Sequence, residues 1–172
     1  YNPAQENAEG GMIAYQEELK DFWFVYKRVL NDSLDHIKNI YQEYLKDEGV
    51  VAKGKIEKAR DFIEEVIRIN KKSNTILAIF DNNFDLKNQQ KNTITKMLSN
   101  SLIQDGQKVQ NFRGAKNLAV FIDAKFKMLY RKSNDHQLQS ESLHDITAIF
   151  KILNEKGTFL KEHEKFTANR LT

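Results

Sequence analysis

Apolar positions recur every three or four residues along most of the chain, which is the spacing of one face of an α-helix. The segments that carry this spacing are residues 12–30, 34–45, 56–80, 84–98, 118–129, 146–153 and 158–171. No segment alternates apolar and polar residues for long enough to indicate a half-buried strand. The pattern therefore predicts about seven helices and no strand.

Polar residues and glycines predict where these helices begin and end. Gly49 is expected to end the second helix as a left-handed C-cap, and the polar run 70–74 is expected to kink or end the third. Asp81-Asn82-Asn83 predicts a turn that caps the next helix. Gly157 is expected to stop the sixth helix, and Thr158 to cap the last.

The predicted helices fall into two groups. Residues 1–11 are polar and predict a flexible tail, and residues 12–98 form the first helical part. Residues 99–116 are rich in Ser, Asn, Asp and Gly and predict a linker or loop. Residues 117–172 form the second helical part, with a polar connection at 131–141. Because the chain does not begin with Met, we interpret it as a fragment or a processed product.

Composition supports an all-α fold. The 172 residues include 1 Pro and 7 Gly, fewer than the turns of a sheet protein need. Hydrophobic residues make up 40%, enough for a core. Cys is 0, which excludes disulfides and thiol catalysis. The longest apolar runs, 76–80 and 118–122, are far shorter than the ~20 residues of a membrane helix.

Charge and motifs assign no chemistry. The first 50 residues carry 5 basic and 10 acidic side chains, and the remaining 122 carry 22 and 14. This bias is too mild for a nucleic-acid binder. No phosphate-binding loop, zinc motif or nucleophile elbow is present. We therefore assign no catalytic, cofactor-binding or metal-ligating residue, and expect no enzyme, cofactor or small-molecule substrate.

Aromatic residues at helical spacing are expected in the core. One group is different: Phe22, Trp23 and Phe24 are consecutive, so they place aromatic rings on more than one face of a helix. These three residues are a candidate partner surface.

Two segments resemble a known family. Residues 118–127, Leu-Ala-Val-Phe-Ile-Asp-Ala-Lys-Phe-Lys, resemble the cullin stretch Leu-Ala/Ser-x-Phe-Ile-Asp-x-Lys-Leu-Lys. Residues 145–159, and then Ala-Asn-Arg-Leu at 168–171, are similar to the cullin run with a Phe-Arg core and an Ala-Lys-Arg-Leu end. The order of the two segments and the gap between them also match. Gly157, Glu162-His163, Asn169 and Thr172 depart from the family pattern, as in a divergent member.

The resemblance implies an all-α scaffold. Residues 12–98 would be the third cullin repeat of the stalk, and 117–172 the beginning of the C-terminal helical bundle. The family-motif and junction residues would be Leu118, Phe121, Ile122, Asp123, Lys125, Phe126, Phe150, Leu153, Phe159, Arg170 and Leu171.

Cullins are the scaffolds of multi-subunit ubiquitin ligases, so the resemblance also implies partners. The chain would be a rigid spacer between the substrate-receptor end and the RING/E2 end of the ligase. Its partners would be the rest of the cullin chain, a RING subunit, and adaptor and regulatory proteins, in the cytoplasm or nucleus. Neither a membrane nor nucleic acid is an expected partner. The alternative function is an unrelated all-helical adaptor domain that presents a groove to a partner helix.

Overall fold

The computed structural model describes residues 16–26, 34–55, 58–99, 103–104, 107–108, 114–131 and 136–171. Within these residues the protein is built of seven helices, which confirms the all-α fold class. They are a helical segment at residues 16–26, α2 (Leu34–Lys53), α3 (Ala59–Ile79), α4 (Phe84–Leu98), α5 (Gly114–Arg131), α6 (His136–Ile152) and α7 (Lys156–Leu171). The predicted tail at 1–11 lies outside the described residues.

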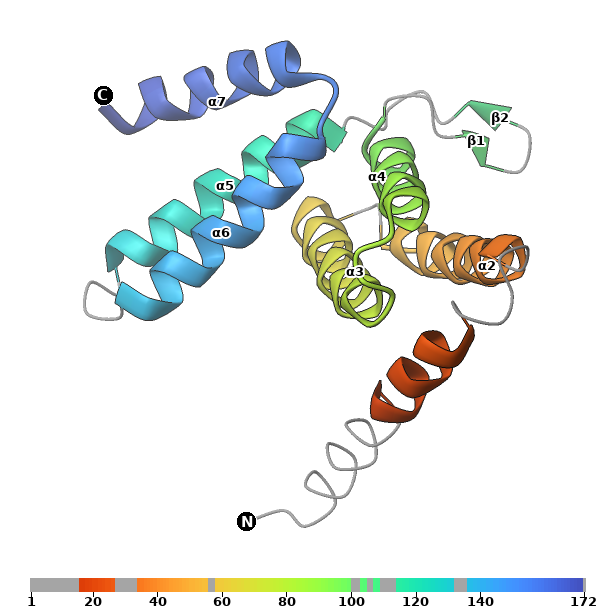
Figure 1. Cartoon of the computed structure of the whole chain (residues 1–172). Coiled ribbons are helices and arrows are strands. Elements are labelled where there is room, and N and C mark those ends of the chain that lie inside the picture. The colour runs from red at the N-terminus through yellow and green to blue at the C-terminus, as the bar shows by residue number, and fades with distance from the viewer. Residues whose placement is uncertain are drawn as a thin grey trace.

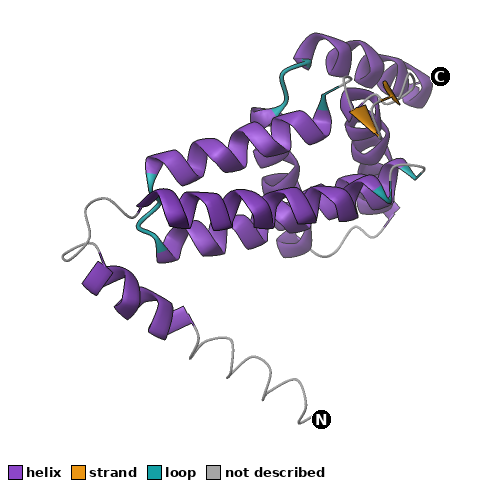
Figure 2. Cartoon of the chain, turned by 90° about the vertical axis from the view of Figure 1, so that its right-hand side faces the viewer, coloured by secondary structure: helices purple, strands orange, loops and turns teal. Residues whose placement is uncertain are grey.

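Helix α3 is the centre of the fold. It contacts α2, α4, α5 and α6, whereas α7 packs mainly along α5. In Figure 1, α2, α3 and α4 are seen nearly end-on while α5 and α6 lie across the view. In Figure 2, turned by 90°, the first group lies across the view and α5 and α6 are seen nearly end-on. The two groups of helices therefore cross at a steep angle. The helical segment 16–26 and α7 lie at opposite ends of the molecule in both views.

The turn between α3 and α4 confirms the prediction for residues 81–83. Asp81 and Asn82 both have a φ of 53°, in the left-handed region that Asp and Asn tolerate better than other non-glycine residues. The Asn83 side chain then accepts hydrogen bonds from the backbone N–H groups of Asp85 (3.0 Å) and Leu86 (3.3 Å). It therefore caps α4.

Gly49 does not end a helix, and that prediction is wrong. Helix α2 continues through it to Lys53. A Cβ atom at Gly49 would lie 3.0 Å from the Cε atom of Met97 on α4. The absence of a side chain thus serves close packing between α2 and α4, not a left-handed turn.

The polar run 70–74 does not interrupt α3 either. Asn70 and Ser73 are buried inside a continuous helix. The Gln90 side-chain Nε2 of α4 donates to the Asn70 Oδ1 (3.2 Å) and the Asn74 Oδ1 (2.9 Å). These polar residues face a polar partner on another helix, so their polarity does not indicate a surface or a break.

The connections between helices differ from the expectations in detail. The segment 99–116 contains a small antiparallel hairpin, β1 (Ile103–Gln104) and β2 (Gln107–Lys108), and α5 begins inside it at Gly114. Helix α6 begins at His136, within the expected polar connection. Gly157 and Thr158 both lie inside α7, so neither stops nor caps a helix; the break falls at residues 153–155.

Candidate functional site at the helix junction

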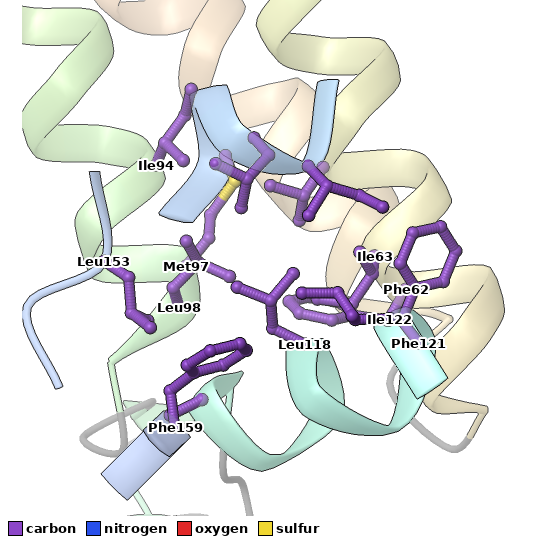
Figure 3. Close-up of a cluster of buried hydrophobic side chains, with 14 of the residues drawn as sticks. Phe62, Ile63, Ile94, Met97, Leu98, Leu118, Phe121, Ile122, Leu153 and Phe159 are labelled. Atoms are coloured by element: carbon purple, nitrogen blue, oxygen red, sulfur yellow. The ribbon is translucent and has the colours of Figure 1, made fainter. Parts of the chain in front are cut away.

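A single hydrophobic core joins the helices on both sides of the 99–116 segment. Its buried members are Ala52 of α2, four residues of α3, three of α4, five of α5 and two of α6. Leu153, in the break after α6, and Phe159 of α7 complete it. Figure 3 shows Ile63, Leu98, Leu118 and Phe159 converging in this core. The two helical groups therefore share one interior. We call this cluster the junction core.

The motif at 118–127 supplies the α5 face of the junction core. Leu118, Phe121 and Ile122 are buried, and Phe121 lies against α3 and α5 side chains (Figure 3). Because they are spaced by three and one residues, the three side chains share one face of α5.

The charged residues of the same motif lie at the edge of this face. The Lys125 ammonium is 3.3 Å from Glu64 Oε1 on α3 and 5.2 Å from the centre of the Phe121 ring. The Lys127 ammonium, one turn later, lies 2.7 Å from Asp123 Oδ2 and forms an ion pair with it. The Lys125–Glu64 pair thus adds a polar bond between α5 and α3 beside the apolar contact.

The second motif closes the junction core from α6 and α7. Leu153 and Phe159 are buried, and Phe150 is partly buried and packs against the core, as does Phe126 of the first motif on α5. The rings of Phe150 and Phe159 are 5.0 Å apart and tilted by 57°, a favourable aromatic arrangement. Arg170 lies in α7, as does Leu171 at its end, but their side chains lie outside the described ones.

An ion-pair cluster that the sequence analysis missed connects α2 to α3. Arg68 pairs with both Glu48 of α2 and Glu65 of its own helix. Lys72 adds a 3.2 Å contact to Glu48, and Lys55 a 2.6 Å contact to Glu65. The spacing of Glu65 and Arg68 was the one available signal, because i,i+3 pairs meet on a helix. The contact to Glu48 spans 20 positions and had no signal.

The cluster shifts the acidity of its carboxyl groups. Burial alone would raise the pKa of Glu65, but hydrogen bonds from Arg68 and Lys55 hold that pKa below its ordinary value. The pKa of Glu48 is lowered in the same way, against its burial, by Arg68 and Lys72. Burial, followed by the charge of Glu48, raises the pKa of the neighbouring Tyr44 to about 12. Both carboxylates are therefore charged at neutral pH, and the cluster is structural.

Two polar contacts fasten α6 to the first helical group. The Lys71 ammonium of α3 is 2.7 Å from Asp145 Oδ2. The Thr95 hydroxyl of α4 donates to the backbone carbonyl of Ile152 at 3.3 Å. Helix α6 is therefore held at both its middle and its end.

The candidate partner surface near the N-terminus is only partly exposed. Phe22 and Phe24 are 58% and 54% exposed. Trp23 is buried; its indole N–H donates to Asp81 Oδ2 at 2.9 Å and its ring contacts Phe80 edge-on. Trp23 is thus an internal anchor, and the exposed apolar surface belongs to its two neighbours.

A separate apolar groove of about 530 Å³ lies between the helical segment 16–26, α2 and α3. Leu19, Phe22, Ile40 and Phe80 are among the residues that line it. It adjoins a second hydrophobic cluster formed by Tyr41, Leu45, Leu77 and Leu86. This groove contains no grouping of acids, bases or nucleophiles that would suggest chemistry.

The described residues contain no group of three or more His, Asp or Glu side chains that could hold a metal ion. Among those residues, none of the helices combines the length and hydrophobicity needed to cross a bilayer.

Comparison with known proteins gives one match. A family model described as the Cullin alpha solenoid domain matches residues 4–172. No curated protein and no solved structure matches the chain.

Proposed function

The chain belongs to the cullin family of scaffold proteins, and from this premise we propose that it is a rigid spacer segment of a cullin-RING-type E3 ubiquitin ligase. In that role it keeps the substrate-receptor end of the ligase at a fixed separation from the RING/E2 end. Such spacing raises the effective concentration of one bound partner near the other. It needs no catalytic residue in the spacer. The family match speaks against an unrelated helical domain, the alternative that the sequence left open.

The observation that carries the proposal is the continuity of the junction core. A hinge between two helical groups needs an interface with few buried contacts. Here Leu98 before the 99–116 segment and Leu118 after it are both buried in the same cluster. Bending at this point would expose apolar surface, at a cost of about 25 cal/mol for each Å². The fold thus favours one fixed angle between the two groups.

We propose the same division of the chain as the resemblance implies. Residues 12–98 correspond to the last stalk repeat, and 117–172 to the start of the C-terminal bundle. The partners in this proposal are the rest of the cullin chain, a RING subunit, and adaptor and regulatory proteins, in the cytoplasm or nucleus. The shared core supports a stiff connection between the two parts.

The ligase role is tested on the native protein. We would immunoprecipitate it from its source with an antibody to this region and identify the co-purifying proteins by mass spectrometry. The expected result is a RING subunit together with a substrate adaptor. Recovery of the protein with no component of the ubiquitin system would contradict the proposal.

The rigidity is tested separately, with spin labels. Because the chain has 0 Cys, introduced cysteines are the only labelling sites. Lys46→Cys on α2 with Lys161→Cys on α7 spans the junction, and both positions are exposed. Asp61→Cys with Thr75→Cys, both on α3, gives the control distribution at about 21 Å from the helical rise. We expect equally narrow distance distributions. A broad one for the first pair alone would contradict a rigid spacer while leaving ligase membership open to the first test.

A further inference from the structure

A groove of about 500 Å³ lies between α4 and α6, with α3 beneath it. We call it the α4/α6 groove. Its walls carry three lysines, Lys87 and Lys91 of α4 and Lys151 of α6. All the residues that line it belong to the described part of the chain.

We propose that the α4/α6 groove binds an acidic polypeptide segment of a partner protein, one that carries a large apolar side chain. This surface is distinct from the junction core, and the proposal does not depend on the spacer function.

The charges of the groove have no partner among the residues that the structure describes. In the described residues, none of Lys87, Lys91 and Lys151 forms an ion pair, and no carboxylate lines the groove. Of the acids close to these lysines in the sequence, Asp85 pairs with Lys38 at 2.7 Å and Asp145 with Lys71 at 2.7 Å, while Glu155 does not line the groove. The groove therefore presents uncompensated positive charge.

The arrangement of these lysines is unfavourable for the isolated chain. Lys87 and Lys91 are four residues apart, so they lie on the same face of α4, where like charges repel. Lys151 adds a third positive charge from the opposite wall. An anionic partner relieves this repulsion, and charge complementarity of this kind also speeds and orients association.

The floor of the groove is rich in hydrogen-bond donors. Gln90 Nε2 donates to the side-chain oxygens of both Asn70 and Asn74. Since their oxygens are already acceptors, the side-chain NH₂ groups of these two asparagines remain for other partners. Neither NH₂ group has a hydrogen bond to any described residue. Together with the lysines, they match carboxylates, which only accept hydrogen bonds when ionised.

An apolar rim favours a polypeptide over a bare anion. Phe84, at the start of α4, is 74% exposed and lines the groove. Ala148 and Ile152 of α6 add apolar surface to the opposite wall. An exposed phenylalanine beside unpaired lysines suits a segment that combines carboxylates with one large apolar side chain, because aromatic side chains bury much apolar area and contribute strongly to the binding energy of interfaces.

The test is binding of defined peptides to the full 172-residue chain. The probes are short fluorescent peptides of glutamate and aspartate with one phenylalanine at varied positions, measured by anisotropy. We expect at least one of these peptides to bind with a dissociation constant below about 1 mM. Lys87→Glu/Lys91→Glu/Lys151→Glu should weaken that binding about tenfold or more. Phe84→Ala should weaken peptide binding less than the triple lysine variant does. Replacing the phenylalanine of the peptide by alanine should weaken binding by a similar factor.

The matched control variant is Lys46→Glu/Lys116→Glu/Lys161→Glu. It makes the same change in net charge at exposed lysines on α2, α5 and α7. We expect it to bind the peptide as the parent does. An equal loss in both triple variants would show non-specific charge attraction and overturn the proposal. So would the absence of binding by every peptide, or binding of single-stranded RNA alone with the same dependence on the groove lysines.

Discussion

The indole N–H of Trp23 donates a 2.9 Å hydrogen bond to Oδ2 of Asp81, 58 positions later in the chain. The Trp23 ring also meets Phe80 edge-on, with ring centres 5.2 Å apart. Asp81 belongs to the left-handed turn between α3 and α4. This turn therefore both changes the chain direction and holds the helical segment 16–26.

Loss of this hydrogen bond should be visible in the fluorescence of Trp23, because Trp23 is the single tryptophan of the sequence. Asp81→Ala removes the acceptor and places alanine at a φ of 53°. We expect a red-shifted emission and a free energy of unfolding lower by about 1–3 kcal/mol. Asp81→Asn is the control, because asparagine keeps an oxygen acceptor and tolerates this backbone conformation. Emission that is unchanged in Asp81→Ala would refute the anchoring role.

Replacement of glycine by alanine is expected to have different effects on stability at Gly49 and Gly114. At Gly49 an added Cβ meets only the flexible end of Met97, and alanine favours the helix, so Gly49→Ala should change stability by less than about 1 kcal/mol. At Gly114 the Cβ meets the backbone of Leu98, including its carbonyl carbon at 2.8 Å. Gly114→Ala should destabilise by about 1–3 kcal/mol. Urea unfolding of both variants compares them directly, and a larger loss of stability for Gly49→Ala would contradict the view that the Met97 side chain can move aside.

Helix positions could be predicted from the sequence wherever apolar spacing reports burial. The α4 bounds follow this rule, since Asn83 supplies a cap and the apolar stripe begins directly after it. The rule fails at Gly49 and Asn70. A glycine is typical of a helix end and an asparagine of a surface or a break. Here Gly49 packs against Met97 of α4, and Asn70 accepts a hydrogen bond from Gln90 of α4. Such tertiary contacts override local preference and leave no trace in the spacing.

The junction core predicts that its two sides unfold together. Leu118→Ala removes a fully buried side chain and should lower the free energy of unfolding by about 2–5 kcal/mol. Because the cluster spans α2 to α7, hydrogen exchange should accelerate in α3 and α7 alike. Leu160→Ala, at a position 58% exposed on α7, is the control and should change little. Faster exchange in α5–α7 alone would show that the two groups are independent.

The ion-pair cluster predicts a loss of stability in acid. The folded state holds the pKa of Glu65 below that of the unfolded chain, so the unfolded state binds more protons as the pH falls. The contribution of Glu65 is present above the ordinary glutamate pKa of about 4.3 and is lost as the pH falls through the lower folded value. We expect the urea midpoint to drop between about pH 5 and pH 3.

The control for this effect is a pair of glutamine variants. Glu65→Gln should be less stable than the parent near neutral pH and should show a smaller decline in acid, since it has no carboxylate to protonate. Glu43→Gln, at an exposed position on α2, should keep the parent's decline. An identical decline in the parent and Glu65→Gln would assign the acid sensitivity to other groups.

Prediction of the site from sequence had a different limit. The family-like motifs pointed to Leu118, Phe121 and Phe159, which the structure buries in one cluster. Neither motif contains Trp23's partner Asp81 or the Glu48–Arg68 pair. Ion pairs between helices depend on the angle at which the helices cross, and a single sequence carries no information on that angle.

The three hydrogen bonds from Gln90 have a consequence for how α3 and α4 are aligned. Contacts between aliphatic side chains have no preferred direction, whereas a hydrogen bond requires a particular donor and acceptor at a particular position. Gln90 Nε2 instead meets the Asn70 carbonyl and the Asn70 and Asn74 side chains at set heights along α3. A slip by one turn, about 5.4 Å, would strand buried amides without partners. The amides therefore fix the axial position of α3 relative to α4, which the apolar contacts between the two helices do not specify by themselves.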